Sequence, residues 1–220
     1  MSNLTRREPS ALQVFVIILI FAGWFICASI LAVQAGFPPV TFNDSALLGV
    51  VQFEFFAFFA AAMTLAIWGW SLDDFKFSVS WRGTFIGLAL YIATLPAYAL
   101  LWFTSAERLS GIQFLDDASA RASLSYGTIF AASLANGIYE EFFLTKYLID
   151  ALHKHGAWFA IGLSTLVRVS YHLYQGPFGA ISVLIYGVIV TSFYWRFRMI
   201  WPVMFAHTVA DIVALVTLAP

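Results

Sequence analysis

The sequence contains little charge and almost no cysteine. Only 10% of its 220 residues are charged, whereas a soluble domain carries about 25%. Hydrophobic residues make up 61% of the chain, and the mean hydropathy is +0.85. The net charge of −1 provides no basic stripe for nucleic acid, which is therefore not an expected partner. The single cysteine, Cys27, excludes an intrachain disulfide framework and a cysteine-rich metal site.

Internal repeats and a polar domain between the apolar segments are also lacking. Runs of about 20 apolar residues are typical of membrane-spanning helices. We identify seven: 11–33, 46–70, 83–104, 125–151, 157–174, 178–195 and 199–217. The first is too long for the apolar part of a signal peptide, which has about 7 to 15 residues. We therefore expect an all-α polytopic membrane bundle of about seven transmembrane helices, with residues 1–220 forming a single integral membrane domain.

The loop charges predict an orientation, because lysine and arginine accumulate on the cytoplasmic side of a membrane protein. With seven spans, one side receives Arg6, Arg7, Lys76, Arg82, Lys146, Lys154, Arg196 and Arg198. The other side receives Arg108 and Arg121. This asymmetry predicts a cytoplasmic N-terminus and an external C-terminus at Pro220.

Five ionisable residues lie inside the predicted spans and form a candidate active site: Glu140, Glu141, His172, His207 and Asp211. A charged residue at the bilayer centre costs several kcal/mol, roughly 2.5 to 3.5 on insertion scales, so such residues normally face a protein interior. Adjacent helical residues point about 100° apart, so we expect one glutamate to act on water and the other to orient partners. His207 and Asp211 are four residues apart and share a helix face.

Arg168 and Glu54 are charged residues that also lie in apolar runs. Arg168 must find an acceptor there, and we expect it to pair with Glu140 or Glu141 and to hold that glutamate ionised. Glu54 stands alone within FEFF. A structural or interfacial role explains Glu54 more simply, and lining of a substrate entrance is the alternative.

The candidate site contains the groups that peptide hydrolysis needs. Hydrolysis requires a base for water, an acid for the leaving amine and donors for the developing oxyanion, and glutamate and histidine can divide these tasks. The same residues could also bind zinc. No HExxH motif is present, and each histidine of the site is in a different run. We therefore favour hydrolysis without a metal or other cofactor, with zinc as the alternative.

Three separated motifs resemble those of the CAAX protease and bacteriocin-processing (CPBP) membrane peptidases, which include prenyl-protein endopeptidases of the Rce type. That family has a glutamate pair followed after three residues by arginine, then phenylalanine-x-x-x-histidine, then histidine-x-x-x-asparagine or a similar polar residue. Here the segments read EEFFLTK, RVSYH and HTVAD. The resemblance covers about residues 124–217, which we take as the catalytic core, with the motifs on helices 4, 5 and 7.

The resemblance implies an intramembrane endopeptidase that acts on a peptide or lipidated protein, with a CAAX-type C-terminus as one substrate class. Glu140 would activate water with His172, and Glu141 would support them. His207 and residue 211 would stabilise the oxyanion. The implied location is a bacterial plasma (inner) membrane, in contact with lipid. The sequence predicts no oligomeric state.

Three positions depart from the family pattern. Thr145 stands where arginine is expected, with Lys146 next to it. Arg168 replaces the phenylalanine, and it would compensate for the missing arginine if the helices pack as in the family. Asp211 replaces asparagine, and since an ionised aspartate cannot donate to an oxyanion, we expect it either to carry a proton or to orient His207.

Two other classes of function fit the same residues. A family member without proteolytic activity could serve as a membrane scaffold, immunity protein or chaperone, and the altered motif positions are compatible with this alternative. A proton-coupled transporter could use the acidic and histidine side chains as a relay. The lack of repeats and broken helices in the sequence argues against a transporter.

Overall fold

The computed structural model describes residues 9–38, 42–105 and 124–217, and within them every regular element is helical. The long helices are α1 (Ala11–Gln34), α2 (Asp44–Ile67), α3 (Trp81–Ser105), α4 (Tyr126–Glu140), α6 (Ala157–His172), α7 (Gly176–Phe197) and α8 (Ile200–Val216). Short segments are η1 (Leu72–Phe75), η2 (Glu141–Tyr147), α5 (Leu148–Leu152), η3 (His153–His155) and η4 (Leu173–Gln175). The predicted all-α fold is confirmed.

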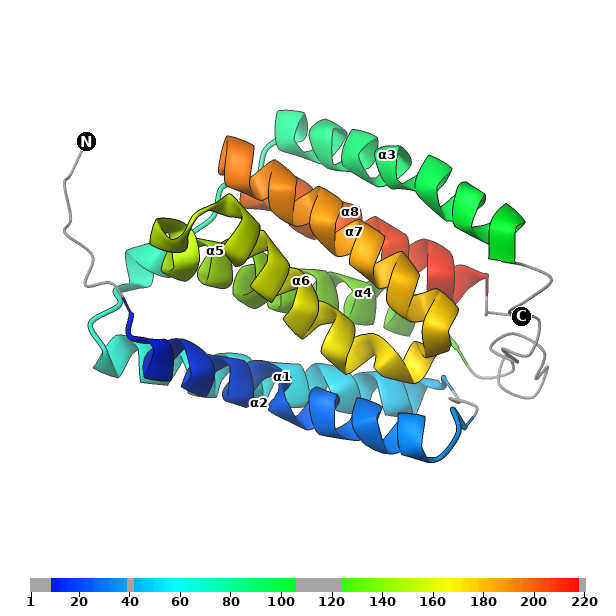
Figure 1. Cartoon of the computed structure of the whole chain (residues 1–220), viewed down its shortest axis with the longest axis horizontal. Helices are drawn as coiled ribbons and strands as arrows, with labels where there is room; N and C mark the ends of the chain where they lie inside the picture. The colour runs from blue at the N-terminus through cyan, green and yellow to red at the C-terminus, as the bar shows by residue number, and fades with distance from the viewer. Residues whose placement is uncertain (1–8, 39–41, 106–123, 218–220) are drawn as a thin grey trace.

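Each of the seven apolar runs corresponds to helical structure. Four described stretches are long and apolar enough to cross a membrane: Ala11–Gln34, Asp44–Ile67, Trp81–Leu101 and Ala157–Phe197. The last contains α6 and α7, which fold back on each other at η4 (Figure 1). Helix α8 is apolar but shorter. The chain is thus an integral membrane helix bundle, and the number of seven spans stays a prediction.

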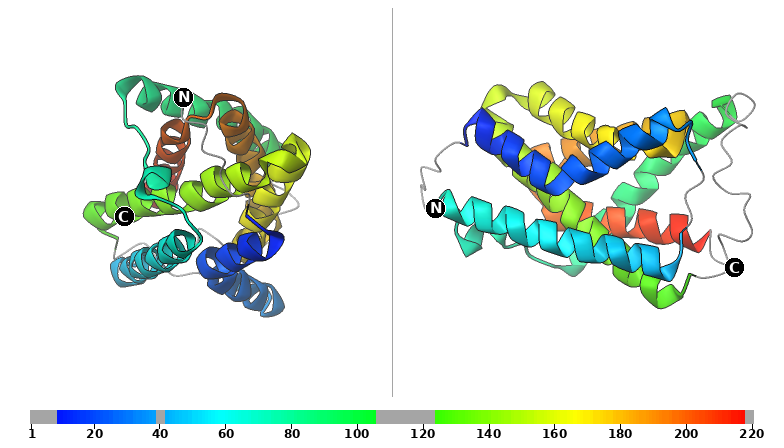
Figure 2. Two further views of the ribbon diagram at one scale, coloured as in Figure 1. Left: turned by 90° about the vertical axis from the view of Figure 1, so that its left-hand side faces the viewer. Right: turned by 90° about the horizontal axis from the view of Figure 1, so that it is seen from below.

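The α4–η2–α5 segment lies in the middle of the bundle. Figure 2 shows α1 and α2 on one side of it and α3, α7 and α8 on the other. Helix α4 packs against both α2 and α8, while α6 packs against α1 and α7. The glutamate pair is therefore surrounded by helices from both halves of the chain.

Small residues allow the central helices to approach closely. A Cβ on Gly137 of α4 would lie 2.6 Å from Thr208 Oγ1 on α8, and one on Gly87 of α3 would lie 2.6 Å from the Pro202 carbonyl oxygen. Glycine at such crossings permits the tight backbone contacts that are common between membrane helices. These contacts hold α8, with His207, against α4.

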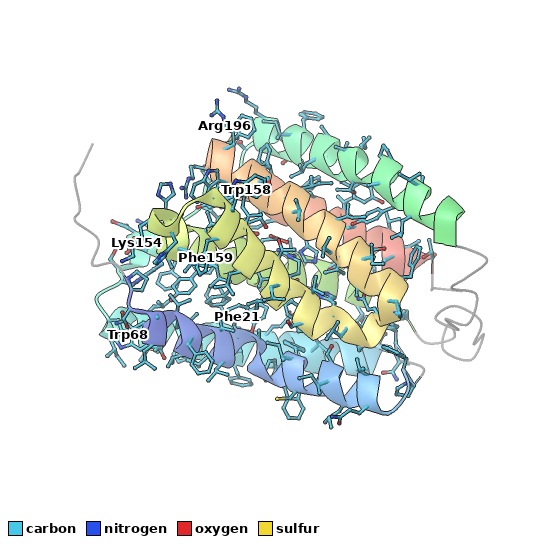
Figure 3. All side chains as sticks on the ribbon, viewed as in Figure 1. Phe21, Trp68, Lys154, Trp158, Phe159 and Arg196 are labelled. Carbon is cyan, nitrogen blue, oxygen red and sulfur yellow. The ribbon has the colours of Figure 1, made fainter. Side chains whose placement is uncertain are left out.

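Basic residues gather at one end of the bundle. Lys154 and Arg196 lie there together with Trp68 and Trp158 (Figure 3). Indoles favour the membrane interface, and the cluster matches the charge asymmetry predicted from the loops. Four of the predicted charges, Arg6, Arg7, Arg108 and Arg121, lie outside the described residues. Which membrane face this end occupies stays a prediction.

Candidate active site

The glutamate pair lies where the central helix changes its winding. Glu140 is the last residue of α4, and Glu141 is the first residue of the π-helical segment η2. A π segment is rare and often occurs at functional sites. Both carboxylates are buried, with Glu140 7% and Glu141 0% exposed. Both adjacent glutamates reach Arg168 and His207, although they lie next to each other in the sequence.

Every direction around the Glu141 carboxylate is occupied. Arg168 binds it through two parallel contacts, Nη1 to Oε1 and Nη2 to Oε2, each 2.8 Å long. The Thr145 hydroxyl donates to Oε2 at 2.5 Å, and His207 Nδ1 lies 2.6 Å from Oε1. A two-pronged arginine contact is the geometry that holds a buried carboxylate most firmly. Glu141 is therefore suited to positioning its neighbours.

Glu140 keeps one oxygen available for chemistry. Its Oε2 accepts a hydrogen bond from the Tyr171 hydroxyl and lies 3.4 Å from Arg168 Nη1. The same oxygen is 3.9 Å from His207 Nε2. Its Oε1 lies 4.0 Å from His172 Nε2. A separation of about 4 Å is too long for a direct hydrogen bond but suits one bridging water molecule.

His172 is oriented by its own helix. Its Nδ1 lies 2.9 Å from the carbonyl oxygen of Arg168, one helical turn earlier in α6. A carbonyl oxygen can only accept, so Nδ1 carries the proton of this bond. In the neutral ring the Nε2 lone pair then points toward Glu140. This tautomer can accept a proton or a hydrogen bond from water at Nε2.

His207 lies between carboxylates from two helices. Its Nδ1 contacts Glu141, and its Nε2 lies 3.5 Å from Asp211 Oδ1, four residues later on α8. The other oxygen of Asp211, Oδ2, accepts a 2.8 Å hydrogen bond from Asn136 Nδ2 on α4. Asp211 thus links the ring of His207 to an amide one turn before Glu140.

Arg168 pairs with the glutamates, as the sequence predicts. Its side chain is 1% exposed and binds both glutamates, with the shorter contacts to Glu141. Its Nη2 also lies 3.3 Å from Thr145 Oγ1, the position where the family pattern has arginine. The guanidinium thus lies beside residue 145, although it comes from a different helix.

All five candidate residues and Arg168 come together around the glutamate pair. Two further side chains contribute that the sequence did not predict, Tyr171 and Asn136. Tyr171 precedes His172, and Asn136 lies four residues before Glu140, so helical spacing could have placed Asn136 on the same face as Glu140. Within residues 9–38, 42–105 and 124–217, no three His, Cys, Asp or Glu side chains have an arrangement that could hold a metal ion.

Comparison with known proteins gives a match at the level of families. Residues 122–213 match the family described as type II CAAX prenyl endopeptidase, Rce1-like. The matched segment runs from just before α4 into α8 and contains all three motifs. Neither the curated proteins nor the solved structures gave a match to this chain.

Proposed function

We propose that this chain, whose residues 122–213 match the type II CAAX prenyl endopeptidase family, is an intramembrane endopeptidase that hydrolyses a peptide bond near a prenylated C-terminus. The observation that carries the proposal is the 4.0 Å separation between Glu140 Oε1 and His172 Nε2, which suits one water molecule. The water is held by an acceptor on each side, inside an apolar bundle. The prenylated substrate class comes from the family description.

The reaction follows from these positions. Glu140 accepts a proton from water while the water oxygen attacks the scissile carbonyl carbon. Glu140 then returns that proton to the amide nitrogen as the carbon–nitrogen bond breaks, which leaves a new carboxyl group and a free amine. His172 holds the water through Nε2. No covalent intermediate with the enzyme is needed.

Stabilisation of the oxyanion falls to His207. With protons on both ring nitrogens, its Nδ1 donates to Glu141 and its Nε2 donates to the negative oxygen. Asp211 faces that Nε2 from 3.5 Å and orients the ring. The second N–H of the Asn136 amide is the additional donor, since its neighbour Asp211 supplies none when ionised. Glu141 fixes the orientation of the His207 ring through Nδ1, and Arg168 holds Glu141 in place.

The experiment that tests this function is cleavage of matched peptides by the purified protein in lipid nanodiscs. Fluorogenic C-terminal peptides with and without a farnesyl group on cysteine are compared, each with and without a chelator. We expect cleavage of the prenylated peptide that resists the chelator. Cleavage that the chelator abolishes would contradict a glutamate-activated water, and the failure of folded protein to cleave any peptide would favour the scaffold function.

Replacing Tyr171 by phenylalanine should slow catalysis without unfolding the protein. The substitution removes the hydroxyl that donates to Glu140 Oε2 and leaves the Arg168–Glu141 pair intact. Hydrogen bonds to charged groups are worth about 1.5–3 kcal/mol, so kcat should fall by about 10- to 100-fold at a nearly constant KM. Tyr174→Phe is the matched control, because that hydroxyl contacts Gln175. Equal effects of both substitutions would contradict the role of Tyr171.

Exchanging Asn136 and Asp211 should rescue the loss caused by a single substitution. Asn136→Asp sets two carboxylates against each other across this contact, and we expect about tenfold slower cleavage. The double variant Asn136→Asp/Asp211→Asn restores one donor and one acceptor across the 2.8 Å contact. Its rate should return to within about threefold of wild type, whereas additive losses, measured as a double-mutant cycle, would contradict a direct link.

A further inference from the structure

Glu54 of α2 is a buried carboxyl that the reaction above does not use. It lies outside the three motifs and is 3% exposed. Its Oε2 has no hydrogen-bond partner within the part of the chain that the structure describes. A buried polar group without a partner costs free energy, and a carboxyl in a membrane bundle costs several kcal/mol. A structural ion pair or hydrogen bond to Oε2 therefore does not account for Glu54.

The side chain belongs to the inward face of its helix. Ala57, Ala61 and Leu65 continue the same buried stripe at helical spacing, whereas Phe55 lies on the outside and is 68% exposed. This stripe packs toward α4, the helix that ends in Glu140. Glu54 therefore faces the interior of the bundle, away from the lipid.

Glu54 lies near the glutamate pair. Phe58, one helical turn after Glu54 on α2, packs against Phe142 and Phe143, which directly follow Glu141, with ring centroids 5.3 Å apart in each pair. The buried guanidinium of the site, Arg168, is already bound to Glu141 through two contacts. The Glu54 carboxyl thus lies beside the site without a donor for its Oε2, which favours a ligand that brings N–H groups.

A peptide substrate brings such groups. Inside an apolar bundle each backbone N–H of an extended peptide needs an acceptor, because water is scarce there. We propose that Glu54 is a substrate-binding residue whose carboxyl accepts a hydrogen bond from a backbone N–H of the peptide bound at the site. The inference rests on the proposed function and adds to it a contact from α2, which lies outside the family match at residues 122–213.

The test uses binding as well as cleavage, in full-length protein in nanodiscs. The probe is a fluorophore-labelled, farnesylated C-terminal peptide, and its Kd is measured on Glu140→Gln with and without Glu54→Leu. We expect leucine to weaken binding by about tenfold or more and to raise the Tm by a few degrees, because it removes a buried unsatisfied group. Glu54→Gln keeps an acceptor oxygen and should bind within about threefold of the unsubstituted background.

A matched control is Gln52→Leu, which makes a similar change at an exposed position of the same helix. It should alter neither the Kd of the peptide nor the Tm. Unchanged binding in Glu54→Leu would overturn the proposal, and so would a fall in Tm that accounts for weaker binding. When Glu140 is intact, Glu54→Leu should raise the KM for the prenylated peptide, while kcat stays within about twofold of the wild-type value. If cleavage depends on Glu140 but not on Glu54, the contact between Glu54 and the peptide is refuted. The proposed protease function is then still supported.

Discussion

Glu140→Gln is expected to lower the rate of peptide cleavage by about 100- to 10,000-fold, the range that a general base contributes. Glutamine cannot accept a proton from the water that we propose between Glu140 and His172. The fold should persist, because the Tyr171 hydroxyl can still donate to the amide oxygen and Arg168 keeps its two contacts to Glu141. Initial rates on the prenylated peptide and the Tm of each variant measure the two effects separately.

The neighbouring glutamate provides the matched control. Glu141→Gln removes the charge that balances Arg168 in a fully buried position, so the main loss should be in stability. Breaking a buried pair by removing one partner costs about 3–5 kcal/mol. Two adjacent substitutions of the same chemistry should therefore give different results: an inactive folded protein and a destabilised one. Cleavage by Glu140→Gln at the wild-type rate would contradict the assignment of Glu140 as the base.

Arg168→Phe should destabilise the protein strongly, and a second substitution, Thr145→Arg, should restore it. Phenylalanine at 168 removes the two-pronged guanidinium contact from the buried Glu141, a loss of about 3–5 kcal/mol. Thr145 Oγ1 already contacts Glu141 Oε2 and lies 3.3 Å from Arg168 Nη2. An arginine at 145 can thus reach the same carboxylate, and the double variant has both residues of the family pattern.

The measurements for this pair are Tm and chelator-resistant cleavage, taken for the single and the double variant. Arg168→Lys is the control for geometry, because a single ammonium cannot form the two-pronged contact. We expect lysine to recover only part of the stability. If Arg168→Phe were as stable and as active as wild type, the guanidinium would not be needed. If Thr145→Arg failed to improve Arg168→Phe, the cation could not be supplied from position 145.

The sequence was sufficient for much of the fold, because membrane helices are recognised by length and hydropathy alone. Each of the seven apolar runs contains helix in the structure, with bounds shifted by no more than three residues at any end. The pairing of Arg168 with the glutamates was also predictable, since an arginine in an apolar run requires an acceptor. The number of membrane crossings was not established in the same way, because α8 is shorter than the other candidates.

The features of the site that could not be predicted depend on local helix winding and on contacts between helices. Counting along straight helices at about 1.5 Å per residue separates His172 from His207 by about 10 Å in depth. In the structure both Nε2 atoms lie about 4 Å from Glu140. The π-helical segment after Glu140 has no single sequence signal that we could use. The contact between Asn136 and Asp211 joins residues 75 positions apart, which periodicity alone cannot show.

The most direct test of the account is a single-turnover cleavage in water enriched in ¹⁸O, with excess protein over the prenylated peptide and mass spectrometry of the product. If Glu140 activates a water molecule for direct attack, one ¹⁸O should enter the new carboxyl group in that first turnover, with or without a chelator. Glu140→Gln should give no labelled product on the same timescale. A new carboxyl group without ¹⁸O, or equally fast labelled product from Glu140→Gln, would contradict the account.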